Sequence, residues 1–462
     1  MSQGTLAGFI AAAAAEFGIP GAAVGVWHGG REVLVCHGVT STENPLPVDG
    51  RTLFQLGSVT KTYTATALVR LAEEGLVDLA APVHRYVPEL ALASEEVAGR
   101  ITVRNLLNHT AGLDWNLVND TGEGDDALAA FVADLGSLPL IAAPGTRASY
   151  SQAGYNLAGR IIENVTGLTY ERAVDRLVLE PLALRDTLFA TGDVMTRRFA
   201  VGHELDADGA AGVTRPWKGT RGNNPGGGIS SSVADQLRWA RFHLGDGRGH
   251  DGAPVLPADA LHRMRQPTVP LIASTLGDAI GTGWFLRDVD GVRTVGHGGS
   301  GFGQFAELLI VPERDFAVVV ASNAGPDAGL LFNRAVVRWV LEHHLGVVDR
   351  DPEPLPHDAE RAGEILGDFE NDVMALTITT DGRALALDVR IKPEIRAASD
   401  TDLPPDLPPA DLGLLPGDAD EYVLTNGGLK GQRGCFTRDA SGAVIGVDLA
   451  GRLFTRTGPT PG

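Results

Sequence analysis

The sequence predicts an α/β protein in which helices flank an antiparallel sheet, with a helical lobe beside it and an all-β module at the C-terminal end. Three observations support this prediction. Strand patterns occur near both ends of the first 346 residues, helix signals dominate between them, and short alternating runs fill residues 362–462. Strands from the two ends must meet to bury their apolar faces, so the helices between them form a second lobe.

The first module, residues 1–346, contains several segments with helix signals. The middle ones are expected to build the helical lobe, at about residues 65–205. Gly75 ends the strongest helix, because glycine readily takes the left-handed conformation that closes a helix. The predicted helices cover residues 5–17, Thr62–Glu74, 102–109, 125–136, 153–166 and Gly329–Leu345.

The strands of the same module alternate apolar and polar residues. The segments His28–Arg31 and Asp290-Gly291 are turn signals, so each is expected to join two strands as a hairpin. We expect one sheet, with the terminal helices packed against it. The predicted strands are Ala22–Trp27, Glu32–His37, Trp284–Asp288, Arg293–His297, Ala306–Val311 and Phe316–Ser322.

Residues 347–361 are predicted to be a linker, because charges and Asp-Pro, Glu-Pro and Leu-Pro steps disfavour regular structure. The all-β module that follows is expected to be a small barrel or sandwich. Asp400–Asp411 is rich in prolines and is interpreted as a loop or as local disorder. The predicted strands of this module include Ala375–Thr379, Ala384–Val389, Glu421–Leu424 and Ala443–Asp448.

The bulk composition excludes several classes of function. A formal net charge of -20 argues against binding to nucleic acid or to anionic membranes. Two distant cysteines make no disulfide framework. No metal-binding motif of the H-E-x-x-H or paired-cysteine type occurs, so we predict no metal and no cofactor. The N-terminal apolar stretch has no basic region before it and is interrupted by Glu16, which favours a cytoplasmic protein over a secreted one.

The most informative motif is Ser58-Val59-Thr60-Lys61, at the start of a helix in a chain with only four lysines. One turn separates Ser58 from Lys61, so both side chains lie on one face. A desolvated lysine can lose its proton and then accept the proton of a serine hydroxyl, whereas an arginine stays charged. The alternative interpretation of Ser58 as a helix N-cap is compatible with this one.

Two further segments carry groups suited to the same chemistry. Tyr150 could pass a proton to a leaving group, since a nearby lysine cation would favour its phenolate form. The alternative is a tyrosine in a loop or core wall. Gly296–Gly301 is a glycine-rich strand that would let a substrate backbone approach and a backbone N–H donate to an oxyanion. The alternative here is a turn with an incidental histidine, His297.

Together these residues resemble the serine hydrolase family of class C β-lactamases, D,D-peptidases and related esterases, over about residues 5–345. Ser58-Val59-Thr60-Lys61 is similar to the family's S-x-x-K element and Tyr150-Ser151-Gln152 to its Y-x-N element. His297-Gly298-Gly299 is similar to the third element, K-T-G or H-x-G. Leu106–Leu113 and Gly226–Ser231 match further family segments. The resemblance therefore implies a β-lactamase/D,D-peptidase-like fold.

The resemblance also implies a role for each matching residue. Ser58 would be the nucleophile, with Lys61 as its proton acceptor or electrostatic partner. Tyr150 would serve the leaving group, and which of Lys61 and Tyr150 is the base stays open. The backbone N–H groups of Ser58 and Ser300 would form the oxyanion hole. The remaining assignments are His297 among the catalytic residues, on the substrate side, and Gln152, Gly298 and Gly299 in substrate binding.

Two departures from the family pattern bear on the substrate. Gln152 stands where asparagine is usual, which lengthens the side chain by one methylene. His297 in place of lysine removes a permanent charge that would bind a substrate carboxylate, so esterase, amidase or peptidase chemistry is expected rather than β-lactamase activity. The absence of a G-x-S-x-G elbow around Ser58 disfavours the α/β-hydrolase fold.

The leading hypothesis is a serine acyl-transfer enzyme that forms an acyl-Ser58 intermediate on an ester or a peptide-like amide, D-residues included. An alternative is a peptide cyclase, because the chain is also similar to penicillin-binding-protein-type thioesterases. These enzymes cyclise nonribosomal peptides and carry a lipocalin-like C-terminal module. Its substrate would be a peptide held on a carrier protein. A third alternative is a catalytically silent binding or regulatory protein on the same fold. Intact Ser58, Lys61 and Tyr150 argue against that last one.

Overall fold

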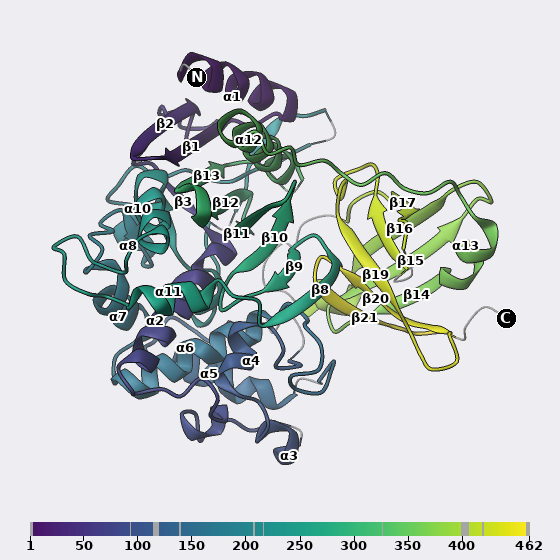
Figure 1. Ribbon diagram of the computed structural model, residues 1–462, viewed down its shortest axis with the longest axis horizontal. Helices are drawn as coiled ribbons and strands as arrows, with labels where there is room; N and C mark the ends of the chain where they lie inside the picture. The colour runs from purple at the N-terminus through teal and green to yellow at the C-terminus, as the bar shows by residue number, and fades with distance from the viewer. Residues whose placement is uncertain are drawn as a thin grey trace.

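A computed structural model describes residues 3–92, 94–113, 120–137, 140–206, 208–215, 217–325, 327–398, 406–417 and 420–458. Figure 1 shows a larger body, with a sheet and a helical lobe, and a barrel that packs beside it. The predicted fold class is confirmed: an antiparallel sheet flanked by helices, a helical lobe, and a closed β-barrel at the C-terminal end.

The main sheet has eight strands in the order β2-β1-β13-β12-β11-β10-β9-β8. The N-terminal hairpin pairs with β13, so the two ends of the first module share one sheet, as the strand pattern predicts. The strands are β1 (Gly21–His28), β2 (Arg31–Gly38), β8 (Val269–Ser274), β9 (Gly277–Ile280), β10 (Phe285–Val289), β11 (Val292–Gly301), β12 (Gln304–Val311) and β13 (Phe316–Ser322).

Helices cover both faces of this sheet because its inner strand β13 presents apolar side chains to each of them. Every residue of β13 is buried. Helices α1 (Gln3–Phe17) and α12 (Ala328–Leu345) pack on each other and close one face, where Ile10, Val24 and Phe332 share a core. Helix α10 (Val233–Leu244), which the sequence analysis does not predict, covers the other face (Figure 1).

The helical lobe contains the predicted helices in shortened or shifted form. Helix α4 is short because Thr102 caps its start and His109, just beyond its end, has a φ of 59°. A small sheet of β3 (Leu53–Gln55), β7 (Ser230–Ser232) and β4 (Thr187–Leu188) lies at the junction with the main sheet. The other helices are α2 (Thr60–Glu73), α3 (Glu95–Ala98), α4 (Val103–Leu107), α5 (Ala127–Asp134), α6 (Gln152–Thr166), α7 (Tyr170–Val174), α8 (Thr191–Val194), α9 (Asn224–Gly227) and α11 (Ala258–Met264); β5 (His203–Leu205) pairs with β6 (Ala211–Val213).

The C-terminal module is a closed barrel in which each strand pairs with the next along the chain, the up-and-down arrangement of lipocalin-like barrels. Its interior is filled by apolar side chains such as Phe369, Leu376 and Phe436. The strands are β14 (Gly367–Glu370), β15 (Met374–Thr380), β16 (Leu385–Ile391), β17 (Ala410–Leu414), β18 (Glu421–Leu424), β19 (Arg433–Arg438), β20 (Val444–Leu449) and β21 (Arg452–Arg456).

Two details at this end of the chain differ from expectation. Helix α13 (Ala359–Ile365) begins inside the segment predicted as a linker, because the Asp358 side chain accepts two of its first N–H groups. Part of Asp400–Asp411 lies outside the described residues, and strand β17 begins at Ala410. A second short helix, α14 (Pro393–Ala398), precedes it. The domain bounds 1–346, 347–361 and 362–462 stay predictions.

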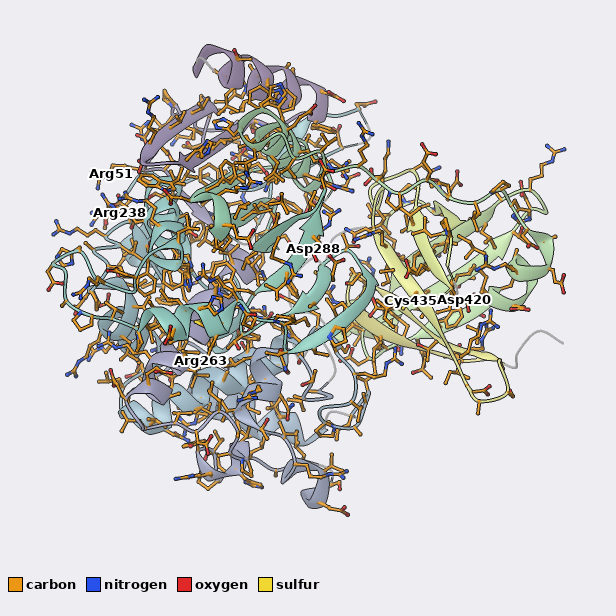
Figure 2. All side chains as sticks on the ribbon, in the orientation of Figure 1. Arg51, Arg238, Arg263, Asp288, Asp420 and Cys435 are labelled. Carbon is orange, nitrogen blue, oxygen red and sulfur yellow. The ribbon has the colours of Figure 1, made fainter. Side chains whose placement is uncertain are left out.

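The barrel packs against the β8 edge of the main sheet (Figure 1). The Arg433 N–H donates to the hydroxyl of Thr275 across this contact, at 2.7 Å. Cys435, labelled on the barrel in Figure 2, and Cys36 in the main sheet are both free thiols, in line with the sequence. Among the described residues, no helix has the length and apolar character needed to cross a membrane.

Candidate active site

Ser58 lies in a short turn of 3-10 helix, Gly57–Val59, that runs directly into α2. Gly57 has a φ of 50°, and a Cβ at this position would lie 2.6 Å from the backbone nitrogen of Ser300. Only glycine tolerates both the left-handed backbone and this contact. The tight turn therefore brings Ser58 beside strand β11, at the boundary between the helical lobe and the sheet.

Lys61 follows one turn later, and its side chain is completely buried. Its Nζ lies 3.1 Å from the Ser58 Oγ, so the reach predicted from the S-x-x-K spacing is present. The same Nζ lies 2.5 Å from Oε1 of Gln152 and 2.7 Å from the carbonyl oxygen of Gly226. Three polar atoms thus surround the amine, and within the described residues no carboxylate forms an ion pair with it.

Burial lowers the pKa of Lys61 well below its usual value, and the positive charge of Arg452 lowers it further. A neutral amine has two N–H groups and one lone pair. Its two N–H groups can donate to Gln152 and Gly226, which leaves the lone pair for the hydroxyl proton of Ser58. The geometry therefore suits Lys61 as the proton acceptor of the nucleophile.

Tyr150 lies just before α6 and is nearly buried. Its hydroxyl interacts with the side chain of Ser58, which acts to lower the tyrosine pKa. Its ring centroid lies 4.9 Å from the Lys61 Nζ and 4.4 Å from the centroid of the His109 ring. Ser58, Lys61 and Tyr150, which are distant in sequence, are brought together as the resemblance implies.

The ionisation expected for Tyr150 is wrong in direction. From the sequence, a nearby lysine cation is expected to favour the phenolate form of Tyr150. Burial instead raises the pKa of Tyr150 to about 12, although its interaction with Ser58 and the charge of Arg452 act in the opposite sense. Since Lys61 is itself driven toward the neutral form, it supplies little charge to the phenol. Tyr150 is therefore a proton donor at neutral pH.

Two buried histidines shape the wall around Tyr150. Burial is the main cause that lowers the pKa of His297 to about 3. His297 is thus neutral, packs 4.8 Å from the ring of Phe285 and brings no charge to the site. The Nδ1 of His109 accepts a hydrogen bond from the Ser151 N–H at 3.0 Å, which is a structural role.

The glycines of β11 allow this strand to touch the backbone around Ser58. A Cβ on Gly299 would lie 2.0 Å from the carbonyl oxygen of Leu56 and 2.7 Å from the nitrogen of Ser58. The pairing of β10 with β11 ends at Gly296, whereas β12 continues along the strand to Gly301. The backbone of Ser300 therefore comes close to Ser58 and Gly57 beside an open strand edge, as an oxyanion hole requires.

Replacing Gly299 by alanine tests this close contact. We expect a loss of about 1–3 kcal/mol in the free energy of unfolding, because the new methyl group meets backbone atoms that cannot rotate away. Labelling of Ser58 by an activated-serine probe should fall with it. Gly8→Ala on α1 is the matched control: no atom lies within 4 Å of its Cβ, and helix propensity predicts a gain of about 0.5–1 kcal/mol. Chemical denaturation measures both, and an unaffected Gly299→Ala variant contradicts the packing argument.

Gln152 is held inside the site by two partners. Its Oε1 faces Lys61 and its Nε2 donates to Oδ1 of Asn223 at 2.5 Å. A Cβ on Gly226 would lie 1.7 Å from this Nε2, so any side chain there would displace the Gln152 amide from this position. The extra methylene of glutamine relative to asparagine is thus used to reach Lys61. Its predicted contact with substrate, like that of Gly298 and Gly299, stays a prediction.

The barrel contributes to the site through the turn between β20 and β21, which the sequence analysis does not anticipate. The carbonyl oxygen of Gly451 accepts a hydrogen bond from the Tyr150 N–H at 2.7 Å, and the Leu453 N–H donates to the hydroxyl of Ser149 at 3.3 Å. The guanidinium of Arg452 lies 4.8 Å from the centroid of the Tyr150 ring. A permanent positive charge therefore reaches Tyr150 from another module.

A cavity of about 360 Å³ opens from these residues. It begins at Ser58, Tyr150 and Arg452 and continues along β11 between the main sheet, α12 and the barrel. Ser58 also borders a smaller pocket on the side of Gln152 and Lys218. The nucleophile is therefore accessible from two sides. Within the described parts of the chain, no cluster of three or more histidines, cysteines and carboxylates is found that could hold a metal ion.

Comparison with known proteins gives consistent results for the larger module. The family model described as Beta-lactamase matches residues 6–342. Penicillin-binding protein 4 of Amycolatopsis lactamdurans is 34% identical over 350 residues, which cover 75% of this chain and 90% of that protein. A class C beta lactamase from Rhodobacter sphaeroides superimposes with a TM-score of 0.60 and 26% identity, over 73% of this chain and 99% of its own.

The crystal structure of SurE is similar to the whole chain, barrel included. Its TM-score is 0.75 at 26% identity, and the match covers 98% of this chain and 99% of SurE. A second structure of SurE, with D-Leu, gives a TM-score of 0.74. The arrangement of the barrel against the larger module therefore recurs in another protein.

Proposed function

Because the chain belongs to the beta-lactamase family of serine hydrolases, we propose that it transfers acyl groups through an ester formed on the Ser58 hydroxyl. The observation that carries this proposal is the buried amine of Lys61, 3.1 Å from the Ser58 Oγ and lowered in pKa. An amine in that state accepts the hydroxyl proton as Ser58 attacks the substrate carbonyl.

Acylation then divides the proton transfers between two groups. Lys61 takes the proton of Ser58 as the new C–O bond forms. Tyr150, protonated because its pKa is raised, donates its proton to the leaving group as the old bond breaks. The backbone N–H groups of Ser58 and Ser300 stabilise the oxyanion. The resulting phenolate faces a protonated Lys61 and the guanidinium of Arg452, which both favour it.

Release of the acyl group runs these steps in reverse. The phenolate of Tyr150 removes a proton from the acceptor, and Lys61 returns its proton to the Ser58 oxygen. This assignment, with Lys61 as base and Tyr150 as acid in acylation, rests on the opposite directions of their pKa shifts. His297 transfers no proton in this scheme, and its pKa of about 3 keeps the imidazole neutral, with a proton on one ring nitrogen.

The substrate class we propose is a peptide-like acyl compound with a carboxylate near the reacting carbonyl. The open edge of β11 can pair with an extended backbone, and Arg452 offers a guanidinium beside Tyr150. This cation occupies the role that a lysine at His297 would fill. The likeness to SurE, one structure of which holds D-Leu, supports peptides that contain D-residues.

A second candidate is transfer of the acyl group to an amine, as in a thioesterase that cyclises a peptide held on a carrier protein. The barrel turn favours it, because it packs over Tyr150, the group that would activate the acceptor, and so limits the access of water on that side of the site. A peptidyl thioester mimic with a free N-terminal amine separates the two candidates. Cyclic product supports transfer to the amine, and linear acid alone supports hydrolysis.

Labelling by a fluorophosphonate probe distinguishes an active serine enzyme from a catalytically silent binding protein. We expect the native protein to be labelled and Ser58→Ala to remain unlabelled. If the native protein takes no label under any condition, the binding or regulatory alternative replaces this proposal.

The pH dependence of labelling follows from the pKa shifts of Lys61 and Tyr150. The active form has neutral Lys61 and protonated Tyr150. The rate should therefore fall as the pH is lowered through the depressed pKa of Lys61, and it should show no alkaline decline from Tyr150 until the pH approaches 12. Stopped-flow labelling across the folded pH range measures this profile. A rate that rises toward acid pH contradicts the assignment of Lys61 as base.

A further inference from the structure

Glu307 is a carboxyl group deep in the Ser58 cavity that the proposed chemistry does not use. It lies on β12, where it pairs with Gly298 of the adjacent strand. Its Oε2 is 2.8 Å from the position that a Cβ of Gly298 would occupy. The glycine next to His297 therefore leaves the space in which this carboxyl sits, and both residues line the cavity.

The carboxyl of Glu307 has no ion-pair or hydrogen-bond partner among the described residues. The cation that acts on it is Arg287, on β10. Two nitrogens of Arg287, however, already bind both oxygens of Asp349, at 3.1 and 2.8 Å. Burial raises the pKa of Glu307 to about 7, which reflects a carboxylate that the protein does not compensate.

The other charged groups of the cavity are each directed toward a partner of their own. Arg334 of α12 pairs with Asp351, and Arg433 of the barrel donates to the carbonyl oxygen of Ser274. Arg452 lies against Tyr150. The walls between these groups are apolar, with Phe305, Leu309 and Val337 among them. A ligand that fits this part of the cavity has an apolar stem and one cationic group.

The distance from Glu307 to Ser58 is comparable to the length of a short peptide substrate. Gly298 and Gly299 are consecutive, and the Ser58 nitrogen lies 2.7 Å from a Cβ built on Gly299. The Glu307 carboxyl therefore lies within about 12 Å of the Ser58 nitrogen, a span of roughly three extended residues. Because consecutive residues of a strand face opposite sides, the Glu307 carboxyl lies on the other face of β11 from Ser58. The cavity joins the two around the open edge of this strand, so one extended substrate can reach both.

We propose that Glu307 binds an ammonium group of the acyl substrate, so that the enzyme selects peptide-like substrates with a cationic group within about three residues of the reacting carbonyl. This inference rests on the proposed acyl-transfer function. The ammonium belongs either to a side chain or to the N-terminal amine of the peptide, and both would supply the missing partner of the carboxylate.

The test uses pairs of short peptidyl thioesters that differ in one group. One pair has lysine or norleucine at the same position, and the other has a free or an acetylated N-terminal amine. We expect the wild-type kcat/KM for thiol release to favour the ammonium member of one pair by about tenfold or more. In Glu307→Gln this ratio should fall to about one. Glu313→Gln, an exposed carboxyl just beyond the end of β12, is the matched control and should keep the ratio.

The pair that shows the preference identifies the source of the ammonium. The proposal is overturned if the wild-type enzyme has equal kcat/KM values for the two members of each substrate pair. It is also overturned if Glu307→Gln keeps the wild-type preference for the ammonium substrate. If the variant does not fold, inhibition of the wild-type enzyme tests the proposal instead. We expect n-pentylamine to inhibit thiol release more strongly than n-pentanol, and equal inhibition contradicts the inference. Failure of the acyl-transfer function itself is distinguishable, because then no thioester, charged or neutral, releases thiol.

Discussion

Replacing Lys61 by arginine is expected to lower the rate of Ser58 acylation by about 1000-fold or more, because a guanidinium stays protonated and cannot accept the serine proton. The wild-type amine is kept from that charged state by complete burial and by Arg452. Lys61→Met, which retains an apolar stem but no base, should be equally inactive. Burst kinetics with an activated ester measure the acylation step directly.

Lys430→Arg is the matched control, because this lysine lies exposed on the barrel. Its burst should equal that of the wild type. Folding of each variant is checked by thermal denaturation, so that lost activity is not confused with lost structure. A full burst from folded Lys61→Arg protein would show that another group accepts the proton of Ser58.

Replacing Arg452 by glutamine is expected to have the second largest effect, although this residue belongs to the barrel. For a substrate with a carboxylate next to the scissile bond, kcat/KM should fall by about 10- to 100-fold. The variant should also move the acid limb of the pH profile to higher pH, since the charge of Arg452 helps to lower the pKa of Lys61. Arg452→Lys keeps the charge and should recover part of the loss.

The control for this variant is Arg383→Gln, in an exposed turn of the same barrel. Steady-state kinetics with a carboxylate substrate and with its methyl ester separate binding of the carboxylate from a general effect. An equal loss for both substrates, with no movement of the acid limb, would mean that Arg452 only supports the barrel turn.

The fold of the larger module could be predicted from sequence because its strand patterns and its helix patterns occupy different stretches of the chain. Periodicity identifies the N-terminal hairpin and β13, and burial of both faces of β13 explains why they must pair. The last two strands of the sheet, β9 and the edge strand β8, are missed because they are short and irregular: their register shifts between Pro270 and Ser274. Such strands are held by the neighbouring strand β10 and the barrel rather than by their own sequence pattern.

In the candidate site, too, the features with a local sequence signal could be predicted and those that depend on distant contacts could not. The S-x-x-K spacing places Ser58 and Lys61 within reach, as a helix turn dictates. The direction of the Tyr150 shift could not be predicted, because it depends on burial beneath the barrel turn and not on the neighbouring lysine alone. Arg452 has no local signal at all: it is one of many arginines and meets Tyr150 through a contact between distant parts of the chain.

Glutamine at position 152 illustrates a change that sequence shows but cannot interpret. The longer side chain is visible in the motif, yet its use depends on Gly226 and Asn223, which come from a separate segment. Only the folded site shows that the added methylene brings the amide to Lys61.

The central claim is that a neutral Lys61 makes the Ser58 hydroxyl nucleophilic, and mass spectrometry of a trapped acyl-enzyme tests it most directly. After brief reaction with an activated ester and acid quench, the account predicts a single added acyl mass that peptide mapping assigns to Ser58, absent from Lys61→Arg. An adduct on a different residue, or continued substrate turnover with no adduct at any time point, would contradict it.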